Sequence, residues 1–223
     1  MIKADLHIHT CYSADCLTPL ERIIECCLER GINCIAVADH NTIAGALRLR
    51  EISPFKVIVA EEILTVVGEI MGLFLSEEVA QGLSAQETIS RIRDQGGLVA
   101  IPHPFGRSLP WRPNVLVSTE ILSQVDIIEA FNSRTPFSRS IREAATLAKK
   151  HRKAASAGSD AHTLGEIGRA YVQMAEFDGP HDFLSSLAQG QIFGQKSSYL
   201  AHFASTWARI RKRMFRDAPR NQL

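Results

Sequence analysis

Apolar runs alternate with amphipathic segments along most of the chain. Five segments have the three-to-four-residue apolar spacing of helices, at 18–31, 43–52, 84–96, 136–151 and 180–189. Between them lie apolar runs that predict buried strands, at 2–6, 33–38, 56–60, 65–75, 98–101, 125–131 and 154–157. Repeated strand–helix units of this kind predict a mostly parallel sheet or barrel.

Two of the predicted helices have clear end signals. Thr18, Pro19 and Glu21 form an N-cap, a first-turn proline and a capping glutamate, and Gly31 ends the same helix. A second capping box opens the helix at Ser84. The segment 105–114, rich in Pro, Arg and Trp, is predicted to be a long surface loop.

Composition is that of a globular protein with an ordinary core. The chain has 223 residues, 45% of them apolar and 22% charged, with a net charge of +1. That charge gives no overall attraction to nucleic acid or to a membrane. No apolar run is long enough to span a bilayer, and charged sequence begins at the N-terminus, so we expect a cytoplasmic protein. The five cysteines form no Cys-x-x-Cys pair, which argues against a disulfide framework or a thiolate zinc site.

Side chains that can bind metals follow the predicted strands. In a parallel architecture the carboxyl ends of all strands lie on one face, so these residues would converge on one pocket. Imidazole and carboxylate groups suit zinc, manganese or iron. Five of the eight histidines are in this set, and we interpret His151, His181 and His202 as ordinary surface residues. The set comprises His7, His9, Asp15, Asp39, His40, Glu61, Glu62, His103, Glu129, Asn132, Asp160 and His162.

Most of these residues lie in five short motifs. The motifs are Asp5-Leu6-His7-Ile8-His9-Thr10, Ser13 with Asp15, Ala38-Asp39-His40, Pro102-His103-Pro104 and Gly158-Ser159-Asp160-Ala161-His162. They resemble the motifs of the PHP (polymerase and histidinol phosphatase) family, from residue 2 to about residue 170. The resemblance implies a distorted (βα)7 TIM-like α/β barrel, here residues 1–199, and the activity of a metal-dependent phosphoesterase.

The resemblance also implies two or three divalent metal ions, Zn, Mn or Fe. The first would be held by His7, His9, Asp160 and a glutamate, and that glutamate would bridge to a second ion on His103. Asp15, His40 and His162 would hold the third.

The bridging glutamate is ambiguous in this chain. Where the family has Gly-x-Glu this chain has Ala60-Glu61-Glu62, so Glu62 is the expected bridge and Glu61 the alternative. Relatives often have a further histidine at the second metal, and Glu69 or Asn132 is the nearest candidate here.

We expect hydrolysis of a small phosphate ester, such as a nucleotide or sugar phosphate, by attack of metal-bound hydroxide. Asp160 would act as a catalytic metal ligand, and His40, His162 or a metal-bound water would protonate the leaving group. Arg134 would hold a phosphate through its planar guanidinium, or else be a solvated loop residue. Arg107 and Arg112 are weaker candidates for the same contact.

Asp5 and Asp39 have two interpretations. They would either orient ligand histidines or cap the local loops.

Three alternatives stay open. A nuclease acting on DNA or RNA ends would need a basic track and stacking aromatic residues, and only 7% of residues are aromatic. The others are a non-catalytic metal-stabilised module and a hydrolase of C–N bonds.

The C-terminal segment 200–223 has a different character. It holds six Lys or Arg residues against one aspartate, which predicts a basic amphipathic helical tail. Phe203, Trp207, Ile210 and Met214 form an apolar stripe at helical spacing, which we expect to pack on the barrel. The alternative is a helix that binds a membrane surface, nucleic acid or a partner.

Overall fold

The computed structural model describes residues 1–106, 118–198 and 201–216. Their nine strands form one barrel-like sheet, in the order β7-β6-β5-β4-β3-β2-β1-β8-β9. Parallel pairing joins β1 to β2, β2 to β3, β5 to β6 and β6 to β7. The strands are β1 (Ile2–Ile8), β2 (Cys34–Val37), β3 (Lys56–Thr65), β4 (Gly68–Leu73), β5 (Leu98–Ile101), β6 (Ile127–Asn132), β7 (Ala154–Gly158), β8 (Ala170–Met174) and β9 (Gln191–Gly194).

Hydrogen bonds between the ends of β1 and β7 nearly close the barrel. Asp160 N donates to His7 O across 2.7 Å, and His9 N donates to Ala161 O across 2.9 Å. The residues that follow these two strands are therefore held side by side. The predicted α/β barrel-like fold is confirmed.

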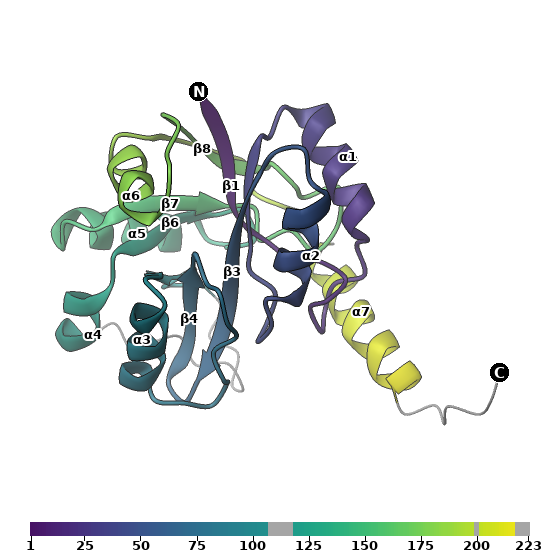
Figure 1. Ribbon diagram of the computed structural model, residues 1–223, viewed down its shortest axis with the longest axis horizontal. Helices are drawn as coiled ribbons and strands as arrows, with labels where there is room; N and C mark the ends of the chain where they lie inside the picture. The colour runs from purple at the N-terminus through teal and green to yellow at the C-terminus, as the bar shows by residue number, and fades with distance from the viewer. Residues whose placement is uncertain (107–117, 199–200, 217–223) are drawn as a thin grey trace.

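The helices lie outside the sheet (Figure 1). The helix that begins at Leu20 ends as predicted at Gly31, which adopts the left-handed conformation. The predicted capping box at Ser84 is also present. Thr18 is not the N-cap as predicted, because its hydroxyl donates to the carbonyl oxygen of His162. The helices are α1 (Leu20–Arg30), α2 (Ala44–Ile52), α3 (Ala85–Asp94), α4 (Thr119–Gln124), α5 (Ser138–Lys150), α6 (Pro180–Ala188) and α7 (Ala201–Arg216).

Alternating residues of the strands serve two apolar cores. In β2, Ile35 and Val37 pack in the core that includes α1 and α2, whereas Ala36 belongs to the core inside the barrel. Phe183 of α6 packs in the inner core as well. This layered packing leaves the carboxyl ends of the parallel strands free to carry polar side chains.

The segment 65–75 is not the single strand that was predicted. The chain turns at Val66 and Val67, because Thr65 accepts a hydrogen bond from Val67 N and donates one to Gly68 O. β4 then runs antiparallel to both β3 and β5. The short elements α4, β8 and β9 were not predicted, and β8 and β9 extend the sheet beyond β1 as antiparallel strands.

The expected packing of the C-terminal stripe is wrong. The four apolar side chains of α7 are exposed, and the helix contacts the barrel through its polar face. In Figure 1, α7 extends away from the body of the barrel. Among the described residues, no helix has the length and apolar character needed to cross a bilayer.

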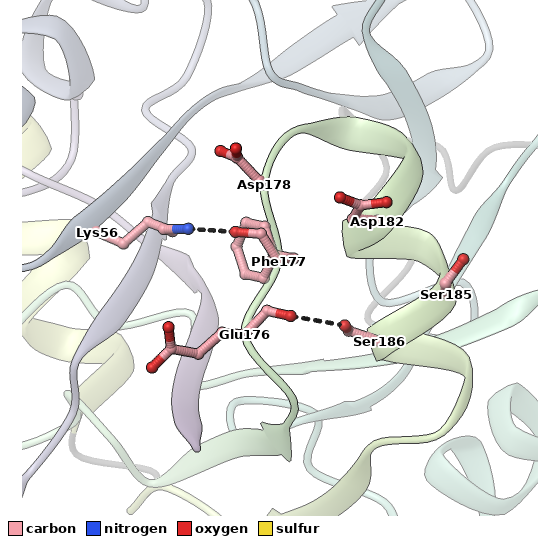
Figure 2. A pocket seen from close by; sticks show the side chains of 7 residues that line it. All are labelled: Lys56, Glu176, Phe177, Asp178, Asp182, Ser185 and Ser186. Atoms are coloured by element: carbon pink, nitrogen blue, oxygen red, sulfur yellow. Dashed lines mark hydrogen bonds between the residues drawn. The ribbon is translucent and has the colours of Figure 1, made fainter.

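A hollow of about 590 Å³ lies at the amino-terminal end of β3 (Figure 2), and none of the predicted metal ligands lines it. Lys56 donates to the carbonyl oxygen of Phe177 there, and its amine lies 4.2 Å from the centre of the Phe177 ring. These contacts tie β3 to the segment before α6. We interpret this end as structural, as is usual for the amino-terminal face of a barrel.

Candidate metal centre

The carboxyl ends of the strands bring together all eight residues that the sequence predicted as metal ligands. They form overlapping groups in which one donor atom of each residue lies within 4.8 Å of the others. Glu69 of β4 joins one of these groups. The first group is His7–His9–Asp160, the second is His7–Glu62–His103 and the third is His9–Asp15–His40–His162, while Glu69 belongs to a fourth, His40–Glu62–Glu69.

The first group has the spacing of ligands around one ion. Nε2 of His7 and Nε2 of His9 lie 3.1 Å apart, and Oδ1 of Asp160 is 3.8 Å and 3.3 Å from them. Ligand atoms about 2.0–2.1 Å from a tetrahedral ion lie roughly 3.3 Å from one another. Two buried imidazole nitrogens that face each other beside a carboxylate therefore fit a divalent cation.

Glu62 faces the cluster and Glu61 does not. Oε1 of Glu62 lies 2.8 Å from Nε2 of His103, and Oε2 lies 3.1 Å from Nδ1 of His40. Glu61 points to the other side of β3, where it accepts a hydrogen bond from Val79 N. Of these two glutamates, Glu62 is therefore the one that lies among the donor atoms of the cluster.

Asp15 is the centre of the third group. Its Oδ2 lies 3.3 Å from Nε2 of His40, and its Oδ1 lies 3.3 Å from Nε2 of His162. Ser13 donates a hydrogen bond to Oδ1, and Arg209 of α7 donates one to Oδ2 across 2.7 Å. No motif or spacing in the sequence predicted Arg209 at this position.

Glu129 and Asn132 support the cluster from behind. Oε1 of Glu129 lies 3.1 Å from Nδ1 of His7, and its Oε2 accepts from His103 N. The amide of Asn132 donates to Glu129 and to Asp160. Between the two candidates for an extra second-metal ligand, Glu69 has the better position, since Asn132 presents a hydrogen-bond donor.

Asp5 and Asp39 cap local loops, as in the second of the two interpretations. Asp5 accepts hydrogen bonds from the backbone and side chain of Ser159 and from Gly168 N. Asp39 accepts two from Thr10, each 2.6 Å long. These hydrogen bonds hold the backbone beside the ligand histidines, and none of them is made to an imidazole ring.

Arg134 is buried behind His162 and is not a solvated loop residue. Its Nη1 lies 2.6 Å from Nδ1 of His162, and its Nη2 donates to Ser205 of α7. Its Nε lies 3.3 Å from Glu166, which also accepts from His162 N. Glu166 was missed because no motif or strand end indicated it. Arg107 and Arg112 lie outside the described residues.

Neighbouring carboxylates favour the charged forms of His7 and His103. Burial opposes the charged form of His7, but Glu129, Asp160 and Glu62 outweigh it and raise its pKa well above the usual range. Burial likewise opposes charge on His103, and the hydrogen bond to Glu62 raises its pKa to about 9.

The neighbouring histidines keep the carboxylate of Glu62 ionised. Burial would raise the pKa of Glu62, but His40 and His7 hold it well below the usual range. Burial and the neighbouring His9 lower the pKa of His162 to about 4, so this ring is neutral at pH 7 and can offer a lone pair to a metal ion.

The backbone at the strand ends is tightly constrained. Asp160 and His103 adopt positive φ values of 53° and 27°, which are uncommon for residues with a side chain. A Cβ atom on Gly158 would lie 2.2 Å from Cβ of His7, so only glycine lets β1 and β7 approach this closely.

Comparison with protein families finds two matches within the chain. Residues 5–102 match the PHP domain, and residues 139–192 match the PHP-associated family. An uncharacterized protein of Methanocaldococcus jannaschii, MJ0417, is 36% identical over 197 residues, which cover 83% of this chain and 79% of that protein.

Solved structures show the same fold at low sequence identity. A two-domain protein from Bacteroides vulgatus, described as containing a predicted PHP-like metal-dependent phosphoesterase, has a TM-score of 0.71 and 16% identity. The match covers 87% of this chain and 65% of that protein, so the chain spans less than two thirds of its length. The lesion-specific endonuclease PfuEndoQ from Pyrococcus furiosus has a TM-score of 0.60 and 16% identity, over 86% of this chain and 57% of that one.

Proposed function

The chain belongs to the PHP family of metal-dependent phosphoesterases, and from this premise we propose that it hydrolyses a small phosphate ester. The overlap of the four donor groups is the main support for this proposal. His7, His9, His40 and Glu62 each belong to two of them, so neighbouring ions would share ligands. Closely spaced metal ions suit the in-line displacement at phosphorus.

The residues divide among three ions in this proposal. His7, His9 and Asp160 would hold the first, and Glu62 would bridge it to a second on His103. Glu69 lies 4.0 Å from His103 and 3.8 Å from His40, and it would complete the second or third set. Asp15, His40 and His162 would hold the third. Zinc, manganese and iron all suit this mixture of imidazole and carboxylate.

Divalent ions in such a site supply a nucleophilic hydroxide at neutral pH and neutralise charge on the phosphate. The chain's own residues hold the reacting groups in place. Glu129 fixes the ring of His7, and Arg134 lies against the ring of His162. Arg134 would thus affect the reaction through His162 instead of gripping the phosphate itself.

Proton transfer to the leaving group is assigned to the third group. His40 would serve there when the third ion is absent, because His162 is neutral at pH 7, and Asp15 would orient both rings through its two oxygens. The side chain of His40 is only 7% exposed and that of His162 only 4%, so the proton would be transferred away from bulk water.

A nuclease is the second candidate, and one surface feature favours it. A hollow of about 420 Å³ along α5 is lined by Arg139, Arg142 and Lys150, together with Phe105 and with Glu143, which pairs with Arg139 across 2.8 Å. Phe105 lies two residues after His103, so this basic surface adjoins the metal centre. A nucleic-acid strand could follow it with its phosphates on Arg142 and Lys150 and a base on Phe105.

One panel of substrates tests both candidates. Metal-stripped protein would be reconstituted with manganese, zinc or iron and offered a nucleoside monophosphate, a sugar phosphate, a phosphodiester, single-stranded DNA, RNA and an amide. Release of phosphate from small esters, lost in the Asp160→Ala, His162→Ala double variant, supports the proposal. Cleavage of nucleic acid alone establishes the second candidate, and cleavage of the amide alone refutes both.

A further inference from the structure

Helix α7 has two faces of opposite character. Ser205 and Ala208 are buried against the barrel, and on the same side Lys212 donates to the carbonyl oxygens of Cys11 and Ser13. On the opposite face the side chains are apolar and open to solvent. They are Phe203, Trp207, Ile210 and Met214, with exposed fractions of 71%, 61%, 47% and 66%.

This arrangement reverses the usual orientation of a surface helix. An amphipathic helix normally turns its apolar stripe to the core and its charges to water. The spacing of four, three and four residues places the exposed side chains of α7 on one continuous line. Four of the nine large apolar residues that are exposed among the described residues lie on this helix. A concentration of this kind marks an interaction surface.

The charge of the helix indicates what the surface binds. The 16 residues of α7 include five Lys or Arg and no Asp or Glu, although the whole chain has a net charge of only +1. Successive residues turn by about 100° around a helix. Arg211, which follows Ile210, and Arg213, which precedes Met214, therefore project on opposite flanks of the stripe, and both are exposed.

We propose that the outer face of α7 binds the surface of an anionic lipid bilayer. The four apolar side chains would enter the boundary between headgroups and acyl chains, and Arg211 and Arg213 would contact lipid phosphates on either side. The stripe is roughly 16 Å long at about 1.5 Å per residue, which suits a helix lying flat in the surface. The inference does not depend on catalytic activity.

The positive charge of α7 also argues against a second copy of the chain as the partner that binds this face. Two stripes packed face to face would bring Arg211 and Arg213 of both copies together. The helix has no acidic residue that could pair with them. Anionic headgroups, in contrast, would neutralise both flanks at once.

Vesicle binding by the full chain tests the proposal. Sedimentation with phosphatidylcholine vesicles is compared with sedimentation with vesicles that also hold one quarter phosphatidylglycerol. We expect binding about tenfold tighter to the anionic vesicles, reduced by high salt. In a Trp111→Phe background, Trp207 becomes the sole tryptophan, and its emission should shift to the blue on binding.

Matched variants separate the two contributions. The Trp207→Ser, Met214→Ser variant should lose binding about tenfold or more, and Arg211→Gln, Arg213→Gln should lose the preference for anionic lipid. Leu28→Ser, Val66→Ser removes two equally exposed apolar side chains elsewhere and should bind as the parent does. Circular dichroism verifies that each variant is folded.

Several results would overturn the proposal. They are equal binding to neutral vesicles, loss of binding in the Leu28→Ser, Val66→Ser control, and absence of vesicle binding by folded protein. A dimer in light scattering that Trp207→Ser, Met214→Ser dissociates, without any vesicle binding, would assign the stripe to a second copy. Binding to duplex DNA but not to vesicles would assign it to nucleic acid.

Discussion

Nη2 of Arg209 lies 2.7 Å from Oδ2 of Asp15, so a guanidinium from α7 pairs with the carboxylate of the third donor group. The same carboxylate faces His40 and His162, each at 3.3 Å. A metal ion bound by Asp15 must therefore share this carboxylate with a guanidinium. Arg209 thus links the C-terminal helix to the loop that follows β1 and to the charge of the metal centre.

Removing this guanidinium should strengthen binding of the third ion. In Arg209→Gln the repulsion between the arginine and the incoming cation disappears, and we expect the affinity of the weakest ion to rise about tenfold. Competition with a chromophoric chelator measures the affinity of each ion. Arg211→Gln, which removes the same charge from the outer face of α7, is the control. Unchanged or weaker affinity in Arg209→Gln would count against this role.

Glu129 should matter for metal binding although it is not assigned as a ligand. It holds Nδ1 of His7 and the backbone of His103, so Glu129→Gln should lower metal affinity by about 10- to 100-fold. Calorimetric titration of the stripped protein measures the change. Glu143→Gln, which removes a carboxylate from a surface ion pair on α5, should bind metal as the parent does. Equal affinity in the two variants would refute the supporting role of Glu129.

Gly158 should tolerate no side chain. In Gly158→Ala the new Cβ meets Cβ of His7 at 2.2 Å and Oε1 of Glu129 at 2.8 Å, so the β1–β7 contact must open. We expect the free energy of unfolding to fall by about 1–3 kcal/mol, measured by urea denaturation, together with weaker metal binding. The control is Gly165→Ala, where the nearest atom is 4.0 Å away. A stable Gly158→Ala variant with unchanged metal affinity would show that this contact is not essential.

The cysteines should differ sharply in reactivity. Burial raises the pKa of Cys16 and of Cys34 to about 12 in each case, whereas Cys11 is half-buried. Because only the thiolate reacts, roughly one in ten thousand of the Cys34 thiols is reactive at pH 8, and this fraction grows as the pH approaches 12. Mass spectrometry after iodoacetamide treatment at pH 8 should find Cys11 alkylated first, and Cys34 only after unfolding. Early modification of Cys34 would contradict this order.

The sequence located the donor residues because parallel strands all end at one mouth of the barrel. That rule needs only the strand positions, so it placed His7, His103 and Asp160 together correctly. It could not decide between Glu61 and Glu62, since a shift of one residue turns a strand side chain to the other face. In the structure Glu62 faces His103 and His40, whereas Glu61 accepts a hydrogen bond from Val79 N on the other face of β3.

The C-terminal helix shows what the sequence could not provide. The stripe on α7 was predicted to face the barrel because apolar faces usually do. The barrel surface beside α7 instead presents carbonyl oxygens of Cys11 and Ser13 and the carboxylate of Asp15. These groups attract Arg209 and Lys212, so the polar side of the helix turns inward. No local pattern in the sequence contains that information.

The most direct test is the rate of phosphate ester hydrolysis as manganese is added stepwise to metal-stripped protein, compared among the parent, Glu62→Gln and Glu61→Gln. Glu62 lies between His103 and His40, whereas its neighbour bonds to Val79 on the other face. We expect the parent and Glu61→Gln to gain activity with added metal and Glu62→Gln to stay inactive. Activity that is independent of metal, or a Glu62→Gln variant as active as the parent, would contradict this expectation.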